Sequence, residues 1–146
     1  VAHTYYWGDI HLQNFGEKRG SQISPVKDAI DYGMKYTFHQ DTPVIPPDMM
    51  RTISSAVNRI SRGGRVIGEN QKISVLDALK AVTIYAAYQY FEEHEKGSIE
   101  CGKYADFVVL EKNPLKTPKE ELAEIKVWMT IKENEVIYRS GEANHE

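Results

Sequence analysis

The residues best suited to chemistry in this sequence are His39 and Asp41, which stand two positions apart just before a proline-rich segment. If the backbone is extended there, residues i and i+2 project to the same side, so the imidazole and the carboxylate would lie together. A histidine and an aspartate placed in this way are typical of a metal site or of a general acid/base pair. An aspartate before Thr-Pro also suits an ordinary turn, so the residues alone leave both interpretations open.

A short strand would be needed to hold Asp41 in this place, and the local sequence favours one. Residues 35–39 alternate between polar and apolar side chains and include Tyr36, Thr37 and Phe38, which favour β structure. The prolines that follow prevent a strand or a helix from continuing. Asp41 is therefore expected where a strand ends and a rigid loop begins.

The beginning of the chain is expected to be a second strand end. Residues 1–6 are rich in β-favouring side chains, and Trp7-Gly8-Asp9 interrupts them with a loop. His3 would lie on this strand, and Asp9 and His11 on its loop, where substrate contacts are frequent. Each of these three side chains could equally be solvated, or satisfy the local backbone.

Three helices are expected around the strand that holds Asp41. One begins at Ser24 and ends at Gly33, and because it directly precedes the strand, the two form half of a parallel βαβ unit. A second begins after Asp48, and a third begins at the Ser74–Asp77 capping box and extends over residues 75–90. The second helix carries an apolar stripe predicted to form core: Met49, Ile53, Ala56, Val57 and Ile60.

The hydrophobic period changes after Gly97. Residues 105–110 form a nearly continuous apolar run, as in a strand buried on both faces, and Thr117-Pro-Lys-Glu120 is a capping box for a short helix. Residues 126–132 alternate and can pair with residues 136–138 as a hairpin. Its turn requires Asn134 to adopt a positive φ at some cost, since glycine is preferred there.

Length and composition limit the classes of protein that remain. The chain has 146 residues, 41% of them hydrophobic and 27% charged, which is typical of a soluble domain or of part of a larger one. A net charge of −3 gives no general reason to expect binding to nucleic acid or membranes. The single Cys101 and the absence of a signal sequence favour the cytoplasm. The start at Val1, without Met, predicts a C-terminal fragment.

Three stretches, in the same order as in the family, resemble the amidohydrolase superfamily, specifically its large metal-dependent hydrolases of the amidohydrolase 3 type. His3 to Asp9 resembles the sixth barrel strand with its loop. His39 to Val44, with Pro47-Asp48, resembles the last barrel strand, and Gly97 to Leu110 resembles the return to a small β-domain. The resemblance implies an α/β fold, with residues 1–96 forming the C-terminal part of a TIM barrel. Residues 97–146 would be the C-terminal strands of the small β-domain.

The resemblance also implies a function and roles for individual residues. In this family one or two divalent metals, zinc being well suited, activate a water that attacks an amide-like C–N bond of a small molecule. Asp41 resembles the last-strand aspartate, which touches the metal and acts as acid and base, and His3 resembles a metal ligand. His39 would orient Asp41, and Trp7, Asp9 and His11 would contact the substrate.

Departures from the family limit what this chain is expected to do alone. The family's ligands on the first, fourth and fifth strands have no counterpart here, and a catalytic zinc normally has three protein ligands. We therefore expect the chain alone to be inactive and to need the missing N-terminal portion of the same protein. Its open barrel edge and the apolar faces around Ile30, Ile53 and Val57 predict a homodimer. Cys101 replaces a residue that is more often proline in the family.

Two other classes of function stay open. The loop at residues 59–65 places Arg59, Arg62 and Arg65 around two glycines, so it could bind a phosphate or a nucleic acid, although a solvated loop is the simpler interpretation. An interaction domain without chemistry is the other alternative. A steep salt dependence of binding would identify the first of these.

Overall fold

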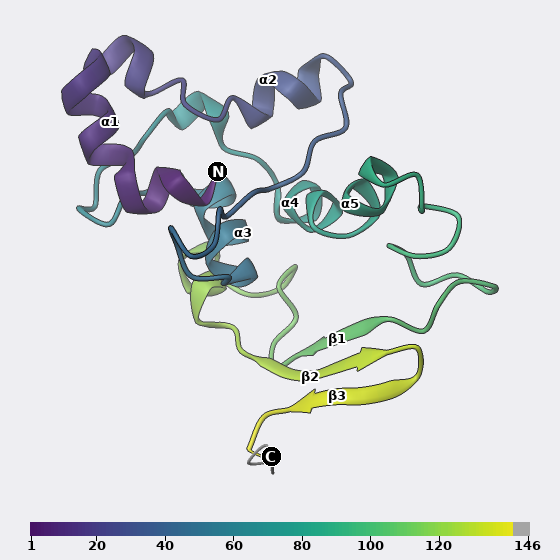
Figure 1. Ribbon diagram of the computed structural model, residues 1–146. Helices are drawn as coiled ribbons and strands as arrows, with labels where there is room; N and C mark the ends of the chain where they lie inside the picture. Colours follow the sequence, from purple (N-terminus) through teal and green to yellow (C-terminus); the bar gives the residue numbers. More distant parts are fainter. Residues whose placement is uncertain (142–146) are drawn as a thin grey trace.

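The computed structural model describes residues 1–141 and places a group of helices over one side of a small antiparallel sheet (Figure 1). Residues 142–146, the end of the predicted β-domain, lie outside the described residues. The elements follow in this order: α1 (Ala2–Gly20), α2 (Val26–Asp31), α3 (Met49–Asn58), η1 (Glu69–Gln71), α4 (Val75–Ala81), α5 (Ile84–Gln89), β1 (Phe107–Leu110), η2 (Lys119–Glu124), β2 (Val127–Lys132) and β3 (Glu135–Arg139).

The sheet has the strand order β1-β2-β3 with antiparallel pairing throughout, which confirms the strands and the hairpin predicted from the sequence. Both turn residues of the hairpin have positive φ, 49° at Glu133 and 69° at Asn134. Amide groups of the turn bond back to the start of β1, with Glu133 N donating to Asp106 Oδ1 at 2.8 Å. The prediction that β1 is buried on both faces was wrong, since Val108 is 55% exposed.

Helix α3 forms the centre of the core through Ile53, Ala56 and Val57, as predicted, whereas Met49 and Ile60 of the same predicted stripe are 40% and 39% exposed. Asp48 caps it by accepting a hydrogen bond from Arg51 N at 2.9 Å, which confirms the predicted start. Ile60 lies beyond the helix, because Arg59 adopts a left-handed conformation with φ 56° and ends it. The main buried cluster takes side chains from α2, α3, α4 and η2, from the segment before α4 and from the residue directly after η2: Val26, Met50, Ile53, Ala56, Val57, Ile73, Ala78, Leu122 and Ile125.

The two strands predicted in the first part of the chain are not formed. Residues 1–6 lie almost entirely within α1, and residues 34–41 have no regular secondary structure. A barrel strand needs neighbouring strands for its N–H and C=O groups, and the structure describes no strand beside either segment. A helix satisfies its own backbone groups, which explains why the first segment is helical.

Two further helix predictions need correction. The helix expected over residues 75–90 is divided into α4 and α5, because Thr83 has non-helical angles of φ −127° and ψ −97°. Thr117 does not cap the next helix, since its hydroxyl donates to Asn113 O and η2 begins after Pro118. The cap of α4 is confirmed, with Ser74 Oγ accepting from Asp77 N at 3.1 Å.

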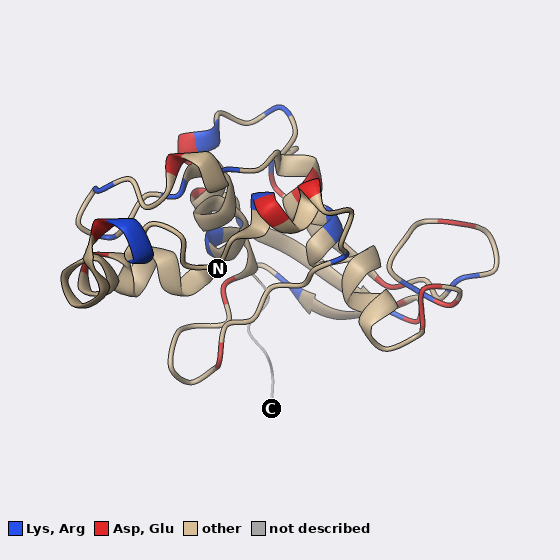
Figure 2. Cartoon of the chain, turned by 90° about the horizontal axis from the view of Figure 1, so that it is seen from above, with Lys and Arg blue, Asp and Glu red and all other residues tan. Residues whose placement is uncertain are grey.

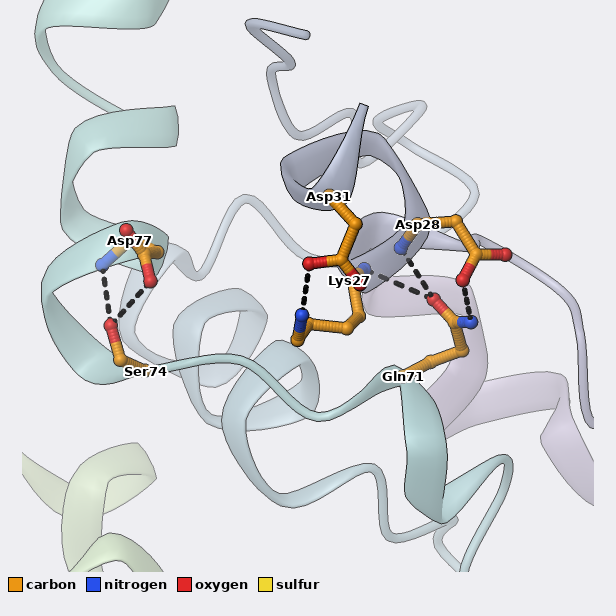
Figure 3. A network of polar contacts seen from close by, with 6 residues as sticks. All are labelled: Lys27, Asp28, Asp31, Gln71, Ser74 and Asp77. Atoms are coloured by element: carbon orange, nitrogen blue, oxygen red, sulfur yellow. Dashed lines mark hydrogen bonds and ion pairs between the residues drawn. The ribbon is translucent and has the colours of Figure 1, made fainter. Parts of the chain in front are cut away.

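The start of α2 is capped by a distant residue (Figure 3). Ser24 has a positive φ of 54° and provides no side-chain cap, contrary to the prediction. Instead Gln71 Oε1 accepts from the backbone N of Lys27 and Asp28 at 3.0 and 3.3 Å, while Gln71 Nε2 donates to Asp28 Oδ1 at 2.7 Å. At the other end Gly33 has a φ of 69° and ends the helix, as predicted.

Candidate functional site

Helix α1 aligns three of the predicted site residues. His3, Trp7 and His11 follow one another at intervals of four residues, so they lie along one side of the helix. His11 also stacks on Phe15, with ring centroids 6.0 Å apart. The helix therefore gathers side chains that the sequence had placed on a strand and a separate loop.

Asp41 lies in a tight loop with a left-handed backbone. Its φ is 61°, an uncommon value for a residue other than glycine, and Val44 N donates to Asp41 O at 2.7 Å across the turn. The Thr42–Pro43 peptide bond is cis. Ile45 is only 2% exposed and anchors the loop in the protein, whereas Asp41 itself is exposed. The carboxylate is thus accessible to water and to a ligand.

A hydrogen bond joins α1 to this loop directly beside Asp41. His3 Nε2 lies 3.3 Å from the backbone oxygen of Gln40. A carbonyl oxygen only accepts, so the Nε2 atom must carry the proton and donate. The structure therefore brings His3 next to the residue that precedes Asp41, although 37 positions separate His3 from Gln40.

The pKa of His11 is lowered by its surroundings on α1. Burial lowers its pKa, and the neighbouring His3 lowers that pKa further. Its Nδ1 atom is buried and has no hydrogen-bond partner among the described residues. Burial and the neighbouring His3 thus both favour the neutral form of the His11 imidazole.

The other predicted residues take separate positions. Asp9 Oδ2 accepts a hydrogen bond from Gly63 N at 3.3 Å, so this carboxylate is engaged with the arginine-containing loop. Trp7 is 39% exposed on α1. His39 is exposed, and no hydrogen bond connects it to Asp41 in the part of the chain that the structure describes. Its role in orienting Asp41 stays a prediction, as do the roles of the other site residues.

Two residues at the site were not identified from the sequence. Gln40 Nε2 donates to Thr52 Oγ1 at 2.8 Å, and Thr52 is 0% exposed on α3. A polar residue among buried positions of an amphipathic helix usually has a hydrogen-bond partner, and this signal was present in the sequence at Thr52. The identity of the partner depends on tertiary structure and could not be read from the chain.

The described residues do not by themselves form a complete metal site. Among residues 1–141 no group of three or more His, Cys, Asp or Glu side chains is placed to hold a metal ion. A catalytic zinc normally has three protein ligands and an open position. His3 and Asp41 have the right chemistry for ligands, but the set is incomplete.

Arg59 is unavailable for an anion, contrary to both interpretations of its loop. The residue is 0% exposed, and its guanidinium donates to backbone oxygens of Ile67, Ile23, Ser24 and Ser21 at 2.7, 2.7, 3.1 and 3.4 Å. Burial lowers the pKa of Arg59 to about 10, so the side chain is still charged at neutral pH. Arg65 pairs with Glu17 at 3.2 Å. Arg59 therefore has a structural role, joining four backbone carbonyls, and its position gives no support to a phosphate-binding loop.

Two further observations concern the distribution of charged residues and the apolar character of the helices. In Figure 2 Lys and Arg residues are interspersed with Asp and Glu over the helices and loops, without a continuous basic face in that view. Among the described residues no helix combines the length and the apolar character needed to cross a membrane.

The fold and the site define an α/β chain in which a proline-rich loop holds Asp41 next to the Gln40 carbonyl that His3 of α1 contacts. A model described as the Amidohydrolase family matches residues 1–138, which is nearly the whole chain. The chain belongs to the amidohydrolase family, and the resemblance noted in its sequence is confirmed.

Individual relatives are similar at a lower level. The chain is 27% identical over 140 residues to the N-substituted formamide deformylase of Arthrobacter pascens, covering 94% of this chain and 26% of that protein. It is 27% identical to the putative amidohydrolase YtcJ of Bacillus subtilis, covering 97% of this chain and 27% of that protein. It is 40% identical over 74 residues to protein LONG AFTER FAR-RED 3 of Arabidopsis thaliana, covering 50% of this chain and 13% of that protein.

The chain thus spans about a quarter of the length of the first two relatives. No solved structure matches it.

Proposed function

We propose that this chain forms the C-terminal part of a metal-dependent amidohydrolase that cleaves an amide-like C–N bond of a small molecule. The observation that carries the proposal is the hydrogen bond between His3 Nε2 and Gln40 O, which lies beside Asp41 in a chain of this family. The relative named as an N-substituted formamide deformylase supports this substrate class.

The proposal assigns one chemical role to each of two residues. Asp41 would accept a proton from the attacking water and deliver it to the leaving nitrogen, a task that suits an exposed carboxylate held in a fixed loop. His3 would be a ligand to a divalent metal, which we propose to be zinc. When bound, such a metal supplies Lewis acidity and lowers the pKa of a coordinated water.

The remaining ligands and the architecture around them are also part of the proposal. The other ligands would come from an N-terminal portion of the same protein. With that portion present, residues 1–96 would form the last part of a TIM barrel, which requires residues 1–6 and 35–39 to exchange the helical and irregular structure seen here for strands. Residues 97–146 would belong to a small β-domain, consistent with the β1-β2-β3 sheet. The free, exposed thiol of Cys101 supports a cytoplasmic location as part of the same proposal.

Metal removal tests this function. In the enzyme that contains this chain, we expect a chelator to abolish hydrolysis of N-substituted formamides and related amides, and added Zn²⁺ to restore it. The 146-residue chain alone should show no turnover. It should bind Zn²⁺ with a Kd no lower than about micromolar, because the binding free energy of about 10–16 kcal/mol found at structural zinc sites requires a full set of ligands. Chelator-resistant hydrolysis would refute the metal dependence, and a nanomolar site in the chain alone would refute the incomplete ligand set.

Self-association of the chain is a further part of the proposal, but the predicted surfaces need correction. Ile53 and Val57 are each 1% exposed and belong to the chain's own core. The apolar surface lies instead in a groove between the helices α3–α5 and the sheet, formed by adjoining cavities of about 760 and 750 Å³ that share residues of α4 and β1. Ile99, at its edge, is 85% exposed.

We expect the 146-residue chain to form dimers at micromolar concentration through this groove, because exposed apolar patches of this kind are rare on monomers. Sedimentation equilibrium measures the mass. A Val108→Glu change places a charge in the groove and should produce monomers, whereas Ser98→Glu, at the polar edge of the groove, should change the association much less. A wild-type chain that stays monomeric would exclude the dimer.

A further inference from the structure

One peptide group connects the two residues assigned to chemistry. The carbonyl oxygen of the Gln40–Asp41 peptide accepts the hydrogen bond from His3 Nε2, and the nitrogen of the same peptide belongs to Asp41. The peptide group is planar and moves as a unit. Any displacement of this group therefore changes the position of Asp41 and the hydrogen bond of His3 together.

The side chain of Gln40 connects this peptide to the core. Its Nε2 donates to Thr52 Oγ1 at 2.8 Å, and Thr52 Oγ1 donates in turn to Asp48 O at 2.9 Å. Thr52 is fully buried on α3, the helix at the centre of the core. The hydroxyl has one proton to donate and lone pairs to accept with, so both bonds are satisfied at once.

The backbone conformation at Asp41 also needs support. A left-handed φ of 61° costs free energy in a residue other than glycine, and such conformations persist where the surroundings determine them. Gln40 is the preceding residue, and its side chain fixes the loop from that side. The turn bond from Val44 N to Asp41 O fixes it from the other.

We propose that Gln40, held by Thr52, is a positioning residue that keeps His3 in its Nε2–H tautomer and Asp41 in its left-handed conformation. This inference rests on the proposed function, in which His3 and Asp41 perform the chemistry. Because Gln40 O accepts from Nε2, the lone pair of the neutral ring is on Nδ1. Nδ1 is therefore the nitrogen with which His3 can accept a proton or bind an electrophile, and the partner on its other nitrogen sets its orientation.

The tautomer of His3 can be measured on the 146-residue chain without any metal or activity. Ring ¹⁵N chemical shifts of ¹⁵N-histidine chains, with His3 assigned through a His3→Asn variant, should show a single Nε2–H form at a pH where the ring is neutral. A Thr52→Val variant removes the hydroxyl at nearly constant shape and should convert this signal to a tautomer mixture. Thr52→Ser restores the hydroxyl and should restore the single form.

A matched control exists elsewhere in the chain. Thr37 Oγ1 donates to Gln89 Oε1 at 2.6 Å, so Thr37→Val removes another threonine–glutamine bond and should leave the His3 tautomer unchanged. If Thr52→Val does not fold, Gln40→Leu breaks the same bond from the half-buried loop side. A wild-type Nδ1–H tautomer, or one that both variants leave intact, would overturn the inference.

Kinetics of the enzyme that contains this chain give the second measurement. Thr52→Val should lower kcat by about 10–100-fold, as is typical for partners of the groups that react, with a smaller change in KM and recovery in Thr52→Ser. If Asp41→Asn has no effect while the tautomer depends on Thr52, the proposed function is wrong and the positioning role stands. If Asp41 is essential but Thr52→Val changes neither tautomer nor kcat, the positioning role is wrong.

Discussion

An Asp41→Asn variant of the proposed amidohydrolase that contains this chain is expected to lose about 10²–10⁴-fold in kcat, the usual effect of removing a general acid or base. Asparagine keeps the size of the side chain but cannot accept the proton of the attacking water. The backbone should be unaffected, because asparagine tolerates the φ of 61° as well as aspartate does, whereas alanine would add strain.

Stability should not change with this substitution. Asp41 is exposed, and in the described part of the chain its side chain takes part in no hydrogen bond or ion pair. Asp31→Asn is a suitable control, since it also removes an exposed carboxylate, one that only pairs with Lys27 on the surface of α2. Initial rates over a range of substrate concentration, together with urea unfolding, measure both properties. Near-normal kcat in Asp41→Asn would exclude this residue from the mechanism.

The parts of the fold that local patterns determine could be predicted from the sequence. Strand β1 follows from a nearly continuous apolar run, the β2–β3 hairpin from alternation, and helix α3 from an apolar stripe and a capping residue close in the chain. Even the unfavourable turn at Asn134 was predicted correctly, because the hairpin left no other residues for it.

The parts that were missed depend on partners far away in the chain. Residues 1–6 and 35–39 were expected to be barrel strands, which form only beside neighbouring strands, and the structure describes none there. The cap of α2 comes from Gln71, about 45 positions beyond its start, and so replaces the local cap expected at Ser24. Local patterns cannot identify interactions of this kind.

The candidate site shows the same division. His3 and Asp41 were recognised separately through motifs, but their connection through Gln40 O spans 37 positions and depends on the packing of α1. Arg59 was misjudged because it was grouped with Arg62 and Arg65, which adjoin Gly63 and Gly64 in an exposed loop. Its four carbonyl partners include Ser21, Ile23 and Ser24, which the local sequence gives no reason to place beside it.

Replacing Arg59 by methionine is expected to lower the free energy of unfolding by about 3–5 kcal/mol, because a buried acceptor left without a donor costs about 1–3 kcal/mol and several are left at once. Methionine has a similar length but no donors, so the backbone oxygens of Ser21, Ile23 and Ile67 lose the hydrogen bonds that Arg59 donates, while Ser24 O keeps the one from Val26 N. These bonds hold the segment before α2 against the end of α3. Urea unfolding followed by circular dichroism measures the loss.

Two further variants separate the causes of this effect. Arg62→Met changes an exposed arginine of the same loop and should alter stability by no more than about 0.5 kcal/mol. Arg59→Lys keeps the charge but has a single ammonium in place of the planar fork, so it can reach fewer of the four carbonyls and should lose an intermediate amount. If Arg59→Lys were as stable as the wild type, charge alone would be sufficient and the fork geometry would be irrelevant. If Arg59→Met were as stable as Arg62→Met, the buried guanidinium would contribute no net stability, and the segment before α2 would have to be held by Gln71 and its partners instead.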